Sequence, residues 1–175
     1  MSDEDLDLSP DPAALVDSLR AFPYTASSAI ADLIDNSIAA GARVVKIFTR
    51  WNNSNPIVEV IDDGSGMSAG ELADALRFAG AGPSAQRAVT DLGRFGLGLK
   101  TASLSQCSRV IVTTMQSGAV ANLGWDVDEL QLSRSWKTSR SVEDELTSHK
   151  ALLNNQNGTV VSWQKLDRLL GRDLV

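Results

Sequence analysis

The first half of the chain shows apolar residues at helical spacing, followed by short β-rich runs. Residues 11–21 and 27–40 carry the helical pattern, with Pro23 between them and Gly41 after the second, so two helices are predicted. The runs RVVKIFTRW and PIVEVID are rich in β-branched residues, and the turn-like NNSNP between them predicts a hairpin. A short helix is expected over residues 69–78, and GLGLKTASLSQC predicts a glycine turn that enters a helix.

Strand patterns dominate the second half. RVIVTTM, AVANLGW, LQLSRSW and GTVVSWQ predict four strands, and VEDELTSHKALL predicts a helix between the last two. Helices therefore gather early in the chain and strands later, which indicates an α+β fold with a sheet covered by helices on one face. No repeat or linker divides the sequence, and 175 residues suffice for one hydrophobic core.

The composition narrows the class of protein. Residues 1–12, MSDEDLDLSPDP, are acidic and contain proline, so we expect a flexible arm before a domain at residues 13–175. The acidic start and the lack of eighteen consecutive apolar residues argue against a signal peptide and a membrane span. The single cysteine, Cys107, fits a reducing cytoplasm, which is the expected location. A net charge of −6 argues against a broad surface for nucleic acid.

Three short polar side chains interrupt the apolar face of the second predicted helix, in DLIDNSIAAGA. Asp32 and Asn36 are four residues apart and share one helical face, and Asp35 is three residues from Asp32. A carboxylate and an amide oxygen at this spacing are able to hold Mg²⁺ and a water near phosphates. The alternative is a solvated helix face, which is where most charged residues lie.

Two glycine clusters are further candidates for a binding site. In DDGSGM, Gly64 and Gly66 follow a predicted strand and permit a tight turn or the close approach of a ligand, although a plain polar turn is the alternative. GRFGLGLKT nearly matches a phosphate-binding loop, but Leu99 separates Gly98 from Lys100, so we reject that assignment. The glycine order also differs from that of dinucleotide-binding motifs. A glycine-rich turn that opens a helix nevertheless favours anion binding.

In combination, DLIDNSIAAGA, DDGSGM, GRFGLGLKT and the late GTVVSW resemble the motifs of the GHKL ATPases. This superfamily comprises gyrase B subunits, ninety-kilodalton heat-shock chaperones, sensor histidine kinases and MutL. The resemblance extends over about residues 25–164 and is closest to Microrchidia-like bacterial members. It implies the Bergerat fold, a two-layer α/β sandwich whose mixed, mostly antiparallel sheet is covered by helices on one face. ATP and Mg²⁺ would bind between helices and sheet, under a mobile lid at about residues 68–92.

The resemblance also implies a role for each matching residue. Asn36 matches the asparagine that ligates Mg²⁺, and Asp62 matches the aspartate that accepts a hydrogen bond from the adenine amino group. Met67 matches an apolar residue that packs on the base, and Thr159 matches a threonine that supports the aspartate through hydrogen bonding. The glycines beside the base are matched by Gly64 and Gly66. The glycines around the phosphates are matched by Gly93, Gly96 and Gly98, and the lysine behind them is matched by Lys100.

Two positions depart from the pattern of the hydrolytic members. Asp32 stands where a glutamate usually activates the attacking water, and its side chain is one methylene shorter, which is expected to slow catalysis. Ala39 stands where gyrase-like and MutL-like helices carry a further acid. The gyrase, MutL and chaperone branches also have a following domain that sends a lysine or arginine to the γ-phosphate. Residues 1–175 do not contain it, so a fragment or a minimal member is expected.

The resemblance implies an ATPase that binds ATP or ADP, hydrolyses ATP slowly with Asp32 as general base, closes its lid and forms a possible ATP-dependent homodimer. No membrane or nucleic-acid partner is expected. Two alternatives remain, a nucleotide-binding switch without significant hydrolysis and a protein kinase of the anti-sigma type. An autophosphorylating kinase is not expected, because the single histidine, His149, lies far downstream in a predicted surface helix. Cys107 and the four tryptophans are expected to serve packing.

Overall fold

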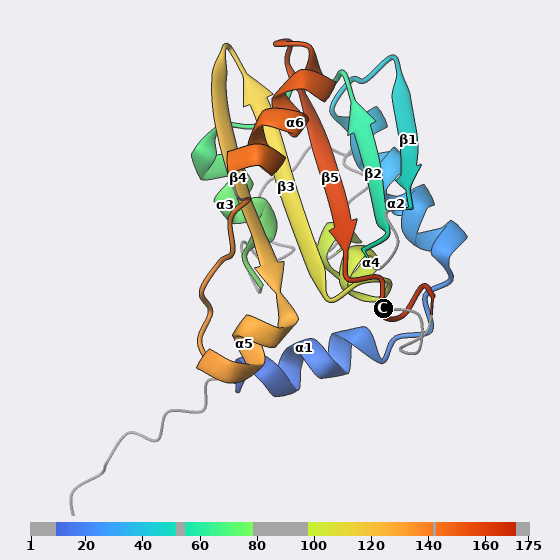
Figure 1. Ribbon diagram of the computed structural model, residues 1–175, viewed down its shortest axis with the longest axis vertical. Coiled ribbons are helices and arrows are strands. Elements are labelled where there is room, and N and C mark those ends of the chain that lie inside the picture. Colours follow the sequence, from blue (N-terminus) through green and yellow to red (C-terminus); the bar gives the residue numbers. More distant parts are fainter. Residues whose placement is uncertain (1–9, 52–54, 79–97, 142, 171–175) are drawn as a thin grey trace, which may run out of the picture.

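A five-stranded sheet with helices on both faces forms the centre of the protein (Figure 1). The computed structural model describes residues 10–51, 55–78, 98–141 and 143–170. The strand order is β1-β2-β5-β3-β4, and every neighbouring pair of these strands is antiparallel. The strands are β1 (Val45–Arg50), β2 (Ile57–Asp62), β3 (Arg109–Gln116), β4 (Ala119–Asp126) and β5 (Gly158–Gln164). β1 and β2 form the predicted hairpin, and β5 inserts between β2 and β3.

Local capping explains where the early helices begin. α1 (Pro12–Arg20) starts with a proline after Asp11, and the side chain of Asp11 accepts a hydrogen bond from the backbone N–H of Ala14, the third residue of the helix. α2 (Ala26–Ala39) is capped by Thr25, and α3 (Ala69–Leu76) begins with a capping box. All three helices were predicted close to these bounds. Within the described parts of the chain, no helix has the length and apolar character needed to cross a bilayer.

The two faces of the sheet are covered differently. One face packs against α2, α3 and α4 (Gly98–Leu104), with α1 packed against α4. The buried sheet residues of this face include Val58, Val60, Val110, Val112, Val161 and Trp163. The other face carries α6 (Glu143–Leu153), as Figure 1 shows. There Leu153 packs with Ile61 and Val160 in a second, smaller cluster. The predicted α+β class is confirmed, and α6 adds a helix on the face that was expected to lack one.

One predicted strand is wrong. LQLSRSW lies partly in α5 (Val127–Ser133), a helix that begins directly after β4. The side chain of Asp126 accepts a hydrogen bond of 3.1 Å from the backbone N–H of Asp128, which caps the first turn. Val127 and Leu130 are buried at helical spacing, whereas Leu132 is 87% exposed. The alternation in LQLSRSW suggested a strand, but the cap and the acidic first turn before it determine the structure.

His149 was expected on a solvated helix surface, and this expectation is wrong. Its side chain is 1% exposed, its Nδ1 lies 2.7 Å from Thr113 Oγ1, and its Nε2 lies 3.4 Å from Glu59 Oε1. His149 and Leu153 are four residues apart on α6, so the face that packs on the sheet carries both. Cys107 is buried, as expected for packing, and burial raises the pKa of its thiol.

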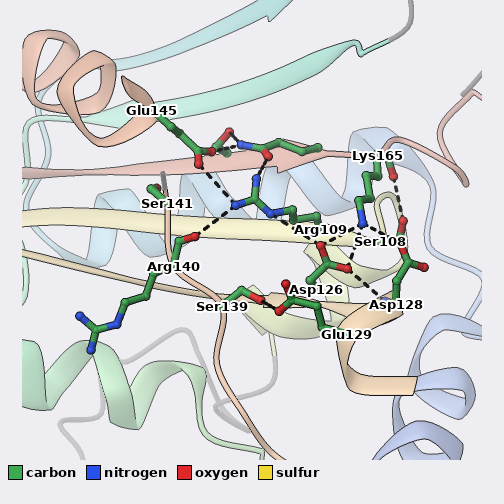
Figure 2. A network of polar contacts seen from close by, with 12 residues as sticks. Ser108, Arg109, Asp126, Asp128, Glu129, Ser139, Arg140, Ser141, Glu145 and Lys165 are labelled. Atoms are coloured by element: carbon green, nitrogen blue, oxygen red, sulfur yellow. Dashed lines mark hydrogen bonds and ion pairs between the residues drawn. The ribbon is translucent and has the colours of Figure 1, made fainter. Parts of the chain in front are cut away.

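Polar side chains join β3, β4, β5 and α6 at one end of the sheet (Figure 2). Arg109 Nη2 lies 3.4 Å from Glu145 Oε2, and Lys165 Nζ lies 2.9 Å from Asp126 Oδ2. Gln164 contacts both Arg109 and Glu145 in the same network. These contacts hold α6 against the sheet on the face opposite to α2 and α4.

Candidate functional site

A cavity of about 540 Å³ lies between the helix layer and the sheet. Residues of α2, α3 and the start of α4 form its walls, and residues of β2, β3 and β5 form its floor. Four motifs that are far apart in the sequence therefore meet at one place. The predicted site residues that line the cavity are Asn36, Asp62, Gly66, Met67, Gly98 and Thr159.

Asp62 is a buried hydrogen-bond acceptor in this cavity. It ends β2, and its side chain accepts hydrogen bonds of 2.9 Å from the backbone N–H of Gly64 and 3.0 Å from Ser37 Oγ. The residue is 8% exposed, and burial raises the pKa of its carboxyl group above 3.8, against the opposing effect of hydrogen bonds from Gly64, Ser37 and the backbone of Thr159. The result is a carboxylate in a fixed orientation with little access to bulk water.

Ser37 is a site residue that the sequence reasoning missed. Ala29, Leu33 and Ser37 are spaced by four residues and form the buried stripe of α2. Ser37 is the polar member of that stripe, and its hydroxyl also lies 3.1 Å from the carbonyl oxygen of Leu33. The available signal in the sequence was the spacing, which places this serine in line with Ala29 and Leu33 on the buried side of the helix. A buried hydroxyl requires a hydrogen-bond partner.

The turn after β2 needs glycine at two positions. Gly66 has a φ of +67°, and a Cβ added there would lie 1.9 Å from the carbonyl oxygen of Met115. A Cβ at Gly64 would lie 2.9 Å from the Cβ of Ala40, at the end of α2. The DDGSGM turn therefore approaches both α2 and β3 more closely than any other residue type would permit.

Met67 and Thr159 are held by a second residue that was missed, Thr114. The backbone N–H of Met67 donates to Thr114 Oγ1 over 2.8 Å, and the two threonine hydroxyl oxygens are 3.3 Å apart. Thr114 is 0% exposed and also donates to the carbonyl oxygen of Gly158. Thr159 pairs with Asp62 across β2 and β5, and its backbone is one of the groups that oppose the rise in the pKa of the Asp62 carboxyl group. The backbone of Thr159 therefore lies beside Asp62, while its hydroxyl contacts Thr114.

The three polar residues of α2 have different surroundings. Asp35 and Asn36 are both exposed and Asp32 is half-buried, but Asn36 lines the cavity and neither aspartate is among its lining residues. The Tyr24 hydroxyl donates a hydrogen bond of 2.8 Å to Asp32 Oδ2. This bond is the main reason why the pKa of Tyr24 is raised. Tyr24 was not singled out from the sequence, where nothing connects it with Asp32.

Lys100, expected near the phosphates, contacts α3 in this structure. Its Nζ donates to the carbonyl oxygens of Ala75 at 2.9 Å and Arg77 at 2.7 Å. The indole N–H of Trp125 donates to the carbonyl oxygen between them, that of Leu76. A positive charge at the C-terminal end of a helix stabilises it, so Lys100 acts here as a cap for α3.

Part of the predicted site lies outside the described residues. Gly98, the first residue of α4, is the one glycine of GRFGLGLKT for which the structure gives a position, and Gly93 and Gly96 fall outside. Of the expected lid, residues 68–78 are described and include α3, and residues 79–92 are not. Residues 1–9 of the expected N-terminal arm also fall outside, while Pro12 already belongs to α1.

Two comparisons relate this chain to known ATPases. The chain is 34% identical over 96 residues to ATPase morc-1 of Caenorhabditis elegans, a match that covers 55% of this chain and 11% of that protein. This chain therefore corresponds to a small part of that relative. A family model described as histidine kinase-, DNA gyrase B- and HSP90-like ATPase matches residues 24–159, well over half of the chain. The protein belongs to this family, the GHKL ATPases, as its motifs predicted.

Proposed function

We propose that the cavity binds ATP or ADP with the adenine base against Asp62. The carboxylate supports this assignment because it is buried, oriented by Ser37 and Gly64, and able to accept a hydrogen bond from an exocyclic amino group. Guanine carries a carbonyl oxygen at the same ring position, and this oxygen has no hydrogen to donate to a carboxylate. Apolar residues of the floor, including Val112 and Val161, would pack on the base. The phosphates would extend towards Gly98, and membership of an ATPase family agrees with this ligand.

The donors of the cavity fit a Mg²⁺ ion bound together with the nucleotide. Asn36 provides an amide oxygen at the cavity wall, and the described residues contain no group of three acidic, histidine or cysteine side chains able to hold a metal. Mg²⁺ commonly binds through one or two protein oxygens, with substrate phosphates and waters as its other ligands. When bound, the ion would neutralise phosphate charge. Asn36 would hold it from α2.

Magnesium titration tests this assignment. Asn36→Ala is expected to remove most of the magnesium dependence of ATP affinity and to leave adenosine affinity unchanged, because the amide acts on the metal and not on the base. Asp35→Ala is the matched control, since Asp35 is adjacent, exposed and absent from the cavity wall. Calorimetric titrations at a series of magnesium concentrations give both quantities. Curves for Asn36→Ala that overlay those of the wild type would exclude Asn36 as a ligand.

We further propose that Asp32 serves as general base in slow ATP hydrolysis. Its support is its position, one helical turn before Asn36 on α2, so that both side chains project from a common side of the helix. The hydrogen bond from Tyr24 favours a second candidate, a nucleotide switch with negligible hydrolysis. The Tyr24 hydroxyl occupies Asp32 Oδ2, an oxygen that a general base would use to take the proton of the attacking water.

Phosphate release from three proteins separates these candidates. If Asp32 is the general base, the wild type should hydrolyse ATP slowly, Asp32→Asn should be inactive and Asp32→Glu should be faster. Glutamate restores the side-chain length that is usual at this position in the family. ATP affinity should stay the same in Asp32→Asn, since a general base acts on the transition state. An Asp32→Asn variant as active as the wild type would place the base elsewhere. If the protein is a nucleotide switch, none of the three proteins should release phosphate, while all of them should still bind ATP.

Lid closure over residues 68–92 and ATP-dependent dimerisation belong to the same proposal, and the family relationship is their support. With a non-hydrolysable ATP analogue, trypsin should cut more slowly after Arg77, and the sedimentation coefficient should rise. Equal cleavage rates with and without the analogue would contradict closure, and an unchanged sedimentation coefficient would contradict dimerisation.

A further inference from the structure

β1 forms an open edge of the sheet. No strand in the described residues pairs with its outer side, which Figure 1 shows at the margin of the molecule. Ile47 is 45% exposed, Phe48 is 44% exposed, and Trp51, just after the strand and expected to be packed, is 66% exposed. With Val44, this short stretch holds four of the eight large hydrophobic side chains that are exposed in the described parts of the chain. Such a concentration marks an interaction surface.

The opposite edge of the sheet is covered. Residues 134–141 run beside β4, where Gly124 and Ser139 exchange two backbone hydrogen bonds of 2.8 Å. The backbone N–H of Ser141 also donates to Asn122 Oδ1 over 2.7 Å. Proteins usually cover or charge an edge strand, because its unpaired N–H and C=O groups form hydrogen bonds with other strands. This protein covers β4 and leaves apolar side chains along β1.

The charge of the β1 edge differs from that of the whole protein. Lys46 and Arg50 lie on the same face of the strand with Phe48 between them, and both are exposed. Arg50 Nη2 lies 2.6 Å from Glu59, while no acidic partner of Lys46 is found among the described residues. The chain as a whole carries a net charge of −6. The edge therefore presents a basic row beside apolar side chains on a protein that is otherwise acidic.

We propose that the outer edge of β1 binds an extended acidic segment of a partner protein, which adds a sixth strand to the sheet. Two acidic side chains four residues apart in that segment would lie opposite Lys46 and Arg50. The alternate positions would carry aliphatic side chains next to those of Val45 and Ile47, on the other face. Main-chain hydrogen bonds would contribute the affinity, and the charges would determine the register.

Charge argues against a second copy of this chain as the occupant. Antiparallel pairing of two β1 strands centred on Phe48 would place Lys46 of each copy opposite Arg50 of the other. Like charges directly opposite each other destabilise a strand pair, whereas opposite charges contribute favourably. An acidic strand satisfies the same apolar and main-chain contacts without this repulsion.

A labelled peptide tests the proposal on the full chain. The probe is Val-Glu-Val-Thr-Val-Glu-Val with an N-terminal fluorophore, and its binding is followed by fluorescence anisotropy. Two control peptides replace glutamate by lysine or place both glutamates together at one end. The alternating acidic peptide should bind, and both controls should bind at least fivefold more weakly. Equal binding of all three peptides, or no binding of the acidic one, would overturn the proposal.

Two variants and a second measurement locate the binding site. Lys46→Glu should weaken binding of the acidic peptide about fivefold and improve binding of the lysine peptide, because it reverses one facing charge. Lys137→Glu makes the same change at an exposed position away from β1 and should have no effect. Hydrogen exchange should slow at residues 45–50 when the acidic peptide binds. Protection confined to another element, or self-association of the peptide-free protein that Lys46→Glu alters, would overturn the proposal.

Discussion

Ser37 Oγ donates a hydrogen bond of 3.0 Å to Asp62 Oδ2, and this contact joins the buried stripe of α2 to the end of β2. It fixes one carboxylate oxygen while the backbone N–H of Gly64 fixes the other. A carboxylate oriented in this way needs no rearrangement to accept a hydrogen bond from a ligand. Preorganisation of this kind raises affinity by reducing the ordering that accompanies binding.

Ser37→Ala should therefore weaken ATP binding. Loss of one hydrogen bond to a charged group typically changes the free energy by about 1.5–3 kcal/mol, so we expect a loss of affinity of roughly tenfold or more. Isothermal titration with ATP measures it. Ser28→Ala, an exposed position on the same helix, is the control and should bind like the wild type. Wild-type affinity in Ser37→Ala would show that the hydroxyl does not orient Asp62.

The raised pKa of Asp62 predicts that the nucleotide-free protein becomes less stable to unfolding as pH rises. Between the ordinary pKa of 3.8 and the higher folded value, the folded protein binds more protons than the unfolded chain, so stability falls as pH rises through that window. At neutral pH the buried charge is fully destabilising. Asp62→Asn should therefore be at least as stable as the wild type at pH 7, and this advantage should shrink as pH falls through the window. Urea denaturation at several pH values tests it, and an advantage that grows towards low pH would contradict it.

Glu59 should behave in the opposite way. Burial raises the pKa of Glu59, but the hydrogen bond from His149 and the charge of Arg50 outweigh burial and lower it below 4.5. The stabilisation is therefore complete above pH 4.5 and is lost as pH falls through the lower folded value. We expect Glu59→Gln to reduce the free energy of unfolding by about 1–3 kcal/mol at pH 7, with a smaller difference in acid.

Urea denaturation of Glu59→Gln beside Glu143→Gln, an exposed position on α6, checks this prediction. ATP affinity should stay the same in both variants, because Glu59 faces α6 and not the cavity. Equal stability of the two variants would show that the contacts of Glu59 with His149 and Arg50 do not stabilise the protein.

The helices and most strands could be predicted because their signals are local. The caps at Asp11 and Thr25, the β-branched runs and the glycine turns each determine an element within a few residues. LQLSRSW failed because its alternation competed with a helix cap that precedes it. His149 failed for a different reason. Whether a helix position is buried depends on a second face of the sheet, and the sequence contained no sign that α6 would cover it.

The residues of the candidate site could be predicted only where they lie within a recognisable sequence motif. Asp62, Asn36 and Gly66 line the cavity as expected, because their motifs are short and follow one another in a characteristic order. Ser37 and Thr114 were missed, since their roles arise from contacts between segments far apart in the chain. The direction of the Lys100 side chain, towards the end of α3, also depends on packing between helices.

The central claim is that Asp62 recognises adenine, and calorimetric titration of ATP into three proteins tests it most directly. The wild type and Asp63→Asn should bind alike, because an asparagine amide oxygen can still accept the backbone hydrogen bonds that Asp63 Oδ1 accepts, and Asp63 is not among the cavity-lining residues. Asp62→Asn should bind about ten- to hundredfold more weakly, since its amide presents a donor where the base also has one, a mismatch of about 1–3 kcal/mol. An Asp62→Asn variant that binds ATP as tightly as Asp63→Asn would contradict the adenine assignment.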